Sequence, residues 1–216
     1  MSISITKYCH IKNKRISVNG NIVFENNEAA NFSEFIRSSY KFAGMAYPKF
    51  YKMDNPCKLA IVATELLLKE TSVIEKCGKD KVGVVLQNSS STIDTDNDFQ
   101  LTIDDRANYF PSPAVFVYTL PNILIGEICI RHGIKGENAF LVSDHFDPGK
   151  VIESVKLLLN KDYAQACLCG WVEVLGDQFE SVLFLVEKEK TIKEYYPGGE
   201  YFAFNIESLT HFYQNK

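Results

Sequence analysis

The segment Phe140-Leu-Val-Ser-Asp-His-Phe-Asp-Pro-Gly-Lys-Val-Ile-Glu-Ser-Val-Lys-Leu-Leu-Leu159 predicts a strand followed directly by a helix. Its first four residues form a short apolar run, which is typical of a buried strand. Asp147 is a favourable helix N-cap, and Pro148 is a favourable first helical residue. Apolar residues then recur at helical spacing, at Val151, Ile152, Val155, Leu158 and Leu159.

Similar units lie on both sides of this segment. Upstream, the sequence predicts a strand with Ile3, Ile5 and Ile11, a hairpin at Asn19-Gly20, a helix over 55–71, a strand over 82–87 and a helix over 121–131. Downstream, residues 164–174 and 181–187 predict two neighbouring strands joined by Leu175-Gly176-Asp177. This order predicts an α/β fold with a five-stranded, mainly parallel sheet, its last strand antiparallel and helices on both faces.

Two further stretches lack a clear helical or strand pattern. The polar residues 88–98, which include Asp94 to Asp98, predict an exposed loop. The chain from about residue 190 holds Pro197-Gly198-Gly199 and a final amphipathic piece, 206–213. We therefore expect a main domain over residues 1–189 and a C-terminal extension over 190–216 that packs on it.

Composition excludes several classes of protein. The chain has 216 residues and a formal net charge of -4, which gives no reason to expect nucleic acid or an anionic membrane as a partner. The start lacks the features of a signal peptide, and the most apolar stretch, 114–130, is interrupted by polar residues and Pro121. No membrane span is expected, and we predict a cytoplasmic protein.

The metal-binding residue types show no ligand spacing. Six cysteines form no C-x-x-C pair, and the four histidines are scattered. Cys167 and Cys169 lie two apart in an apolar run, where a strand would place both in the core. The sequence therefore predicts neither a metal site nor a cofactor.

A series of short motifs resembles the N-terminal half of the β-ketoacyl synthases, which have a thiolase-like fold. Tyr51-Lys-Met-Asp before Lys58-Leu-Ala is similar to their M-D-x-x-x-x-L-A stretch, and Lys81-Val-Gly-Val-Val-Leu to their R-V-G-V-V strand. Tyr109-Phe-Pro-Ser-Pro, Tyr118-Thr-Leu-Pro-Asn-Ile-Leu-Ile-Gly-Glu-Ile and His132-Gly-Ile-Lys-Gly-Glu-Asn continue the series, and Cys169-Gly-Trp-Val-Glu-Val resembles the family's G-G-x-E turn. The resemblance covers roughly residues 45–187 and implies half of a thiolase-like fold.

The catalytic cysteine of the family has no counterpart here. The resemblance implies a nucleophilic cysteine at a helix N-terminus, where the dipole lowers its pKa and the thiolate accepts the acyl group. The equivalent position is His145, within Ser143-Asp144-His145-Phe146, and no cysteine lies within ten residues of it. A complete synthase also has a second half that supplies the decarboxylation residues, so condensation lacks both parts of its chemistry here.

Three functions remain open for such a chain. The first is a catalytically inactive accessory subunit that resembles chain-length factors and acts in fatty acid, polyketide or aryl polyene/flexirubin-type biosynthesis. The second is a small acyl-thioester transferase or hydrolase using His145, with Ser143 or Asp144. The third is a non-catalytic module that binds an acyl chain or carrier protein. Adjacent Ser143, Asp144 and His145 are not expected to form a triad, because their side chains point apart.

The resemblance also implies a binding region and partners. Candidate residues for an acyl pocket or subunit contact are Phe110, Phe116, Tyr118, Asn122 and Phe140, although Asn122 also suits a helix cap. In the family the strand after G-P-N, here about 139–143, pairs across a two-fold axis. We therefore expect a homodimer, or a heterodimer with a full-length β-ketoacyl synthase, served by an acyl carrier protein. If the tail covers the face of the missing half, the need for a partner is weaker.

Overall fold

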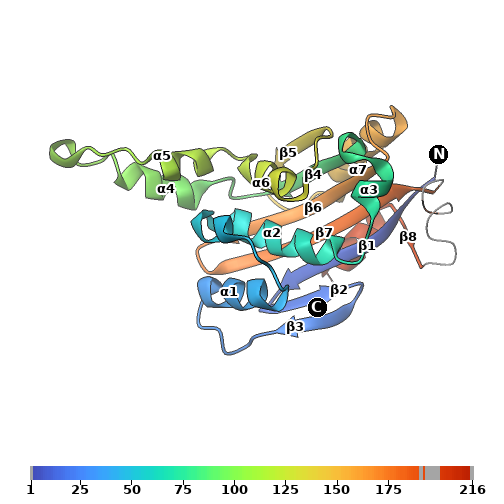
Figure 1. Cartoon of the computed structure of the whole chain (residues 1–216), viewed down its shortest axis with the longest axis horizontal. Helices are drawn as coiled ribbons and strands as arrows, with labels where there is room; N and C mark the ends of the chain where they lie inside the picture. The colour runs from blue at the N-terminus through green and yellow to red at the C-terminus, as the bar shows by residue number, and fades with distance from the viewer. Residues whose placement is uncertain (1, 190–191, 193–199, 215–216) are drawn as a thin grey trace.

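A computed structural model describes residues 2–189, 192 and 200–214, and they form one mixed sheet with helices on both faces (Figure 1). The strands in spatial order are β3 (Asn21–Glu25), β2 (Arg15–Val18), β1 (Ile3–Lys12), β7 (Gln178–Lys188), β6 (Ala166–Leu175), β4 (Val82–Asn88) and β5 (Asn138–Val142). The short β8 (Phe202–Ala203) also pairs with β1. Only β4–β5 and β4–β6 pair in parallel.

The prediction of a five-stranded, mainly parallel sheet is wrong, because the sheet in the described residues has eight strands and most of its pairings are antiparallel. The five expected strands are present as β1, β4, β5, β6 and β7, and β7 runs antiparallel to its neighbours β1 and β6. The predicted hairpin forms at Asn19 and Gly20, whose φ angles of 49° and 80° suit a tight hairpin turn. Its strand β2 pairs with β1, which would otherwise form an edge, and β3 pairs with β2.

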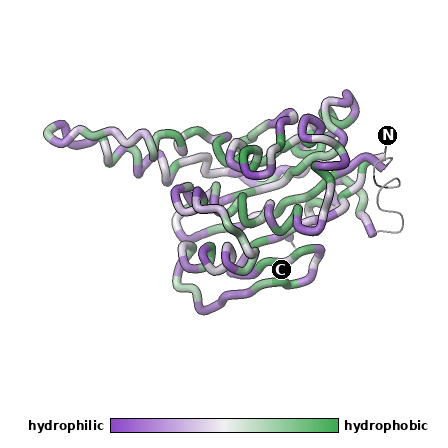
Figure 2. Tube along the Cα trace, in the orientation of Figure 1, coloured by the Kyte–Doolittle hydropathy of each residue, from purple (hydrophilic) through white to green (hydrophobic). Residues whose placement is uncertain are grey.

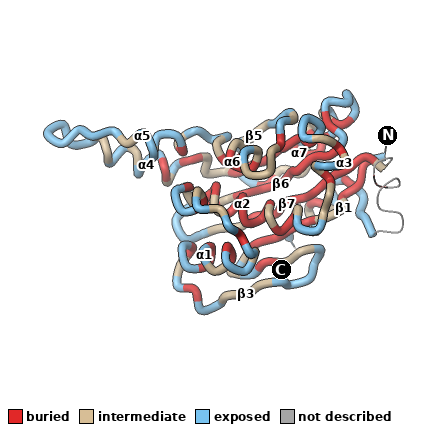
Figure 3. The backbone as a smooth tube through the Cα atoms, viewed as in Figure 1, coloured by how far each residue is buried: buried red, intermediate tan, exposed pale blue. Residues whose placement is uncertain are grey.

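Two hydrophobic cores lie on opposite faces of the sheet. One face is covered by α1 (Phe32–Phe42), α2 (Asn55–Leu68), α3 (Val73–Cys77) and α6 (Ile123–His132). The other is covered by α7 (Pro148–Asn160) and α9 (Ile206–Gln214). In Figure 3 the buried part of the chain follows the sheet and the inner sides of these helices. All seven residues of β4 are buried, so this strand lies at the centre of the molecule.

The tail contributes directly to the second core. The rings of Phe212 in α9 and Tyr8 in β1 stack with centroids 4.2 Å apart. The ring centroids of Tyr213 and Phe146 lie 5.0 Å apart. Leu209 is fully buried between α9 and the sheet. Of the predicted extension, residues 190–191, 193–199 and 215–216 lie outside the described residues, whereas β8 and α9 pack on the sheet.

The stretch predicted as an exposed loop contains a helix instead. Residues 93–101 form α4 (Ile93–Leu101), and with η3 (Arg106–Asn108), α5 (Pro113–Phe116) and η4 (Val117–Thr119) they build an arm, residues 93–120, that projects from the body (Figure 1). Asp94 and Asp96 lie in the first turn of α4, where the helix dipole favours negative charge. Phe99 packs against Phe116 with centroids 5.2 Å apart, which joins α4 to α5.

The segment that resembles a G-G-x-E turn lies inside a strand. Residues 169–174 belong to β6, and the chain turns later, at Gly176, whose φ is 59°. Gly170 has a φ of 146°, and a Cβ there would lie 2.0 Å from the carbonyl oxygen of Val182 on β7. Gly170 is therefore required by the close approach of β7 and not by a turn.

None of the described helices is by itself long and apolar enough to cross a membrane. The pair Pro113–Thr119 and Ile123–His132 meets the length and composition criteria only when taken together across a 101° bend.

Gly170→Ala should lower the free energy of unfolding by about 1–3 kcal/mol, because it combines backbone strain with a clash against Val182. Gly126→Ala, in α6, is the matched control, since a Cβ there meets no atom within 4 Å. Alanine favours helix by about 1 kcal/mol over glycine, so the control should keep or raise stability. Urea unfolding followed by circular dichroism measures both; equal stability of Gly170→Ala and wild type would contradict the assignment.

Candidate functional site

The loop between β5 and α7 contains Ser143, Asp144 and His145, the candidate site residues that the sequence resemblance suggests. A buried amide on the central strand fixes this loop. Gln87 Oε1 accepts a hydrogen bond from the Asp147 backbone N–H at 3.0 Å, and Gln87 Nε2 donates to the Asp147 carbonyl at 3.3 Å. Gln87 is fully buried, so both bonds are shielded from water. The start of α7 is thereby held against the end of β4.

The N-terminus of α7 is occupied by the chain's own carboxylate. Asp147 Oδ1 accepts from the Lys150 backbone N–H at 3.1 Å, as predicted for an N-cap. This hydrogen bond and the nearby Lys150 ammonium hold the pKa of Asp147 below its usual value. Because the carboxylate already neutralises the positive end of α7, this helix end offers little stabilisation to a second anion.

Ser143, Asp144 and His145 are not assembled into a triad. The Ser143 N–H donates to the Asn88 carbonyl at 2.9 Å, and its Oγ accepts from Lys150 Nζ at 3.4 Å. Asp144 and His145 are exposed. Among the described residues no hydrogen bond joins any two of these three side chains. The geometry therefore provides neither an activated hydroxyl nor an oriented imidazole.

The six cysteines do not provide a thiolate nucleophile. Cys129 is half-buried, and the others are buried. Burial raises the pKa of Cys9 to about 12 and that of Cys77 to about 11, and it also raises the pKa of Cys57, Cys129, Cys167 and Cys169. At neutral pH these groups are thiols, which are poor nucleophiles.

The five predicted binding residues do not gather around one pocket. Phe110 and Phe116 lie on the arm and are exposed, Phe110 by 80%. Tyr118 is buried where the arm meets the body. Asn122 takes the N-cap position of α6 without a side-chain capping bond, and Phe140 lies half-buried on β5 against the first core. The arm and β5 are close to the same end of the sheet (Figure 1).

A buried polar cluster joins the arm to the body, and sequence reasoning missed it. Tyr118 Oη donates to Glu127 Oε1 at 3.2 Å, and Lys49 Nζ pairs with Glu127 Oε2 at 2.7 Å. Thr95 Oγ1 donates to Asp54 Oδ2 at 3.3 Å, which links α4 to the start of α2. The available signal was Glu127 itself, a charge within the otherwise apolar helical stretch 123–130.

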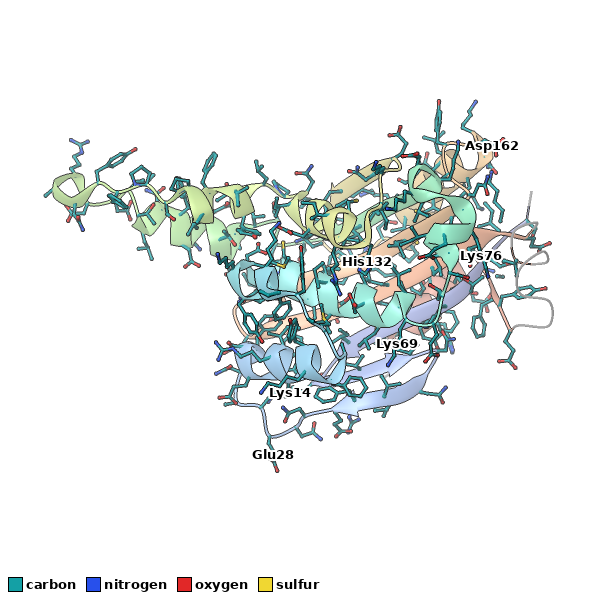
Figure 4. All side chains as sticks on the ribbon, in the orientation of Figure 1. Lys14, Glu28, Lys69, Lys76, His132 and Asp162 are labelled. Carbon is teal, nitrogen blue, oxygen red and sulfur yellow. The ribbon has the colours of Figure 1, made fainter. Side chains whose placement is uncertain are left out.

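The arm presents several large apolar side chains to solvent. Large exposed hydrophobic residues along it are Ile93, Leu101 (73% exposed), Tyr109, Phe110, Phe116, Val117 and Leu120. Hydrophobic stretches on the arm are visible in Figure 2, and in Figure 4 its side chains stand away from the body. Such a group on a projecting element is typical of a protein–protein contact.

The outer edge of β5 is open beside the arm. In the described residues β5 pairs only with β4, and Val142 on it is 55% exposed. An unpaired edge strand presents free N–H and C=O groups that another chain can pair with. The arm and the β5 edge together form what we call the docking surface, defined by residues 93–120 and 138–142.

Known proteins resemble the chain both in sequence and in fold. No family model matches it. Over 123 residues it is 25% identical to 3-oxoacyl-[acyl-carrier-protein] synthase 2 of Synechocystis sp., a match that covers 56% of this chain and 30% of that protein. The ishigamide ketosynthase/chain length factor superposes with a TM-score of 0.65 at 18% identity. The chain has a ketosynthase-like fold.

Two further structures share this ketosynthase-like fold. One is AntDE:AntF, a type II PKS acyl-carrier protein in complex with its ketosynthase (TM-score 0.62, 14% identity, 89% of this chain). The other is the ketosynthase ApeO in complex with its chain length factor ApeC from Xenorhabdus doucetiae (TM-score 0.55, 13% identity, 87% of this chain). The alignments cover 63% of the ishigamide chain, 64% of the AntDE:AntF chain and 79% of the Xenorhabdus chain.

Asp147→Ala should lower the free energy of unfolding by about 1 kcal/mol at neutral pH, because it removes the cap of α7. The pKa of Asp147 is lowered in the folded state, so the cap stabilises the fold above the unfolded pKa of about 3.9. This contribution is lost as pH falls through the lower folded pKa.

The stability difference between Asp147→Ala and wild type should therefore shrink on acidification below about pH 4. Urea titrations at pH 7 and at acid pH measure it. Asp144→Ala, at an exposed neighbour, is the control and should change stability by less than about 0.5 kcal/mol. An Asp147→Ala variant as stable as this control at pH 7 would contradict the cap.

Proposed function

We propose that the protein is a catalytically inactive, ketosynthase-like accessory subunit that resembles chain-length factors and pairs with a full-length β-ketoacyl synthase. The pathway would be fatty acid, polyketide or aryl polyene/flexirubin-type biosynthesis. The observation that carries the proposal is the docking surface, where an exposed apolar arm and an open sheet edge lie toward the same end of the sheet (Figure 1).

The residues at the nucleophile position support inactivity in condensation. Condensation needs a group that accepts the acyl chain as a covalent intermediate. The equivalent position holds the exposed His145, and the helix end beside it is capped by Asp147. The cysteines elsewhere are buried or half-buried thiols. A subunit with this geometry depends on a partner for the covalent step.

The docking surface supports a protein partner. Phe110 and Leu101 are far more exposed than is usual for residues of their size, and they lie on an element that the body does not cover. Adding a strand to the open edge of β5 would satisfy its free backbone groups. Two of the similar structures are named as a ketosynthase with its chain length factor, which suggests the kind of partner. A homodimer through the same surface is the alternative.

The face of α7 gives less reason to expect a partner. The outward residues of α7 include Lys150, Glu153 and Lys156, which are exposed and charged. α9 covers the sheet beside α7 and fills the second core with Leu209 and Phe212. Because α9 packs beside α7 on this side of the sheet, we propose the partner at the docking surface instead.

An acyl carrier protein is the proposed source of the acyl chain for the assembled pair. AntDE:AntF is named as an acyl-carrier protein in complex with its ketosynthase. For this chain the carrier protein would meet the pair and not the isolated subunit, because the covalent chemistry belongs to the partner.

Phe110→Asp combined with Phe116→Asp should weaken association with the co-expressed synthase at least tenfold, because charges would be placed in an apolar contact. Leu157→Asp is the matched control: Leu157 is also exposed, by 56%, but lies on α7 away from the docking surface. Affinity can be measured by bio-layer interferometry with purified partner. Equal loss of affinity in both variants, or in neither, would contradict the proposed surface.

The isolated protein should remain unacylated when incubated with acyl-acyl carrier protein, while a cysteine-dependent synthase treated in parallel gains the acyl mass. Intact mass spectrometry reads this directly. His145→Ala should behave like wild type in the assembled pair, with product length and rate unchanged within about twofold. A stable adduct on the wild-type chain that disappears in His145→Ala would instead support the acyltransferase alternative.

A further inference from the structure

A cavity of about 460 Å³ lies at the opposite end of the sheet from β5. It is formed by the three N-terminal strands and α9, and it is lined by Tyr8, His10, Lys12, Asn13, Arg15, Ser17, Gly20, Ile22 and Phe212. Its volume falls within the range of small-molecule sites. None of these residues belongs to the docking surface, so the cavity is independent of the proposed function.

The floor of the cavity contains an unsatisfied buried imidazole. His10 is only 7% exposed, and its Nε2 has neither a hydrogen-bond partner nor contact with solvent. Burial and the nearby Lys12 lower the pKa of His10 to about 4, so the ring is neutral at pH 7. A buried polar group without a partner costs free energy, and a head group that displaces the side chains covering Nε2 and hydrogen-bonds to it recovers that cost.

Hydrogen-bond donors dominate the rest of the lining. Ser17 is the direct cross-strand neighbour of His10, so its hydroxyl lies on the same face of the sheet. Lys12 pairs with Glu180 at 2.7 Å, which leaves two of its three N–H donors for another acceptor. Arg15 binds Glu25 through Nε and Nη2, so its Nη1 donors remain.

The lining contains no carboxylate of its own, although Glu180 and Glu25 outside it pair with the two cations. Besides Asn13, the remaining lining side chains are largely apolar. Tyr8 and Phe212 form a stacked aromatic wall, and Ile22 is 60% exposed on the other side. A Cβ at Gly20 would lie 3.0 Å from the hydroxyl oxygen of Tyr8, so glycine leaves room for that group at the rim. The two cations and the hydroxyls suit an anionic oxygen acceptor, whereas the aromatic wall suits an apolar body.

We infer that this cavity binds a small amphipathic organic anion, with its carboxylate or phosphate head against His10, Lys12, Arg15 and Ser17 and its apolar body against Phe212 and Ile22. The neutral imidazole donates one hydrogen bond to the head, and the cations supply charge-assisted ones. The apolar body gains by leaving water along the aromatic wall.

The test is a nuclear magnetic resonance titration of the full chain, labelled with ¹⁵N, against three probes. Hexanoate has both parts of the inferred ligand, hexanol only the body, and inorganic phosphate only an anionic head. Hexanoate should give saturable shifts in residues 8–22 and around Phe212, with at least tenfold tighter binding than either other probe. Shifts confined to other residues, or equal binding of hexanol and hexanoate, would overturn the inference.

His10→Leu should weaken hexanoate binding about tenfold, because it removes one hydrogen bond and keeps an apolar side chain in the core. If that variant does not fold, Arg15→Gln at the exposed rim should still weaken binding severalfold. Lys156→Gln on α7 is the control that removes a charge elsewhere and should bind hexanoate like wild type. Wild-type affinity for hexanoate in both folded cavity variants would overturn the assignment. An equal loss of affinity in the Lys156→Gln control would overturn it as well.

Discussion

The buried amide of Gln87 controls where the chain enters α7. Its two hydrogen bonds to the backbone of Asp147 connect the end of the central strand β4 to the loop after β5. With that loop fixed, Phe146 points into the second core beside Trp171, and its neighbours Asp144 and His145 are left exposed. Asp147 then caps α7, two residues after His145, the position that the sequence resemblance aligns with the nucleophile of a synthase. The same small set of contacts thus fixes the loop before α7 and leaves Asp144 and His145 at the surface.

The two ends of the sheet differ in how far the chain itself covers them. At the β1 end, the hairpin β2–β3, the short β8 and α9 cover edges and faces with the chain's own residues. At the β5 end, the edge is open and the arm extends past it, tied at its root by Tyr118–Glu127 and Thr95–Asp54. These polar contacts hold the arm in position, while its apolar side chains remain available to a partner. This asymmetry is what favours a partner at one end and a small-molecule cavity at the other.

Sequence periodicity predicted the central units, because buried strands and amphipathic helices leave clear apolar patterns. The strand at 82–87, the cap at Asp147 and the Asn19-Gly20 hairpin are all present. The arm was missed because Asp94, Asp96 and Asp98 are typical of a loop, and α4 is stabilised by its dipole and by Phe99 against Phe116. In the polar cluster at the root of the arm, Glu127 pairs with Lys49, which is 78 positions away in the sequence. The cavity that His10 lines is likewise lined by Phe212, from the other end of the chain. Such contacts between distant parts of the chain have no local sequence pattern.

Hydrogen–deuterium exchange of the protein alone and with the proposed partner, a full-length β-ketoacyl synthase, would locate the contact. Amides in residues 93–120 and 138–142 should become protected on association, because the arm is covered and the edge of β5 gains a partner. Amides in α7 and α9 should keep the exchange rates of the isolated protein. Protection confined to α7 and α9, with the arm and β5 unchanged, would show that the partner occupies the opposite face and would contradict the account.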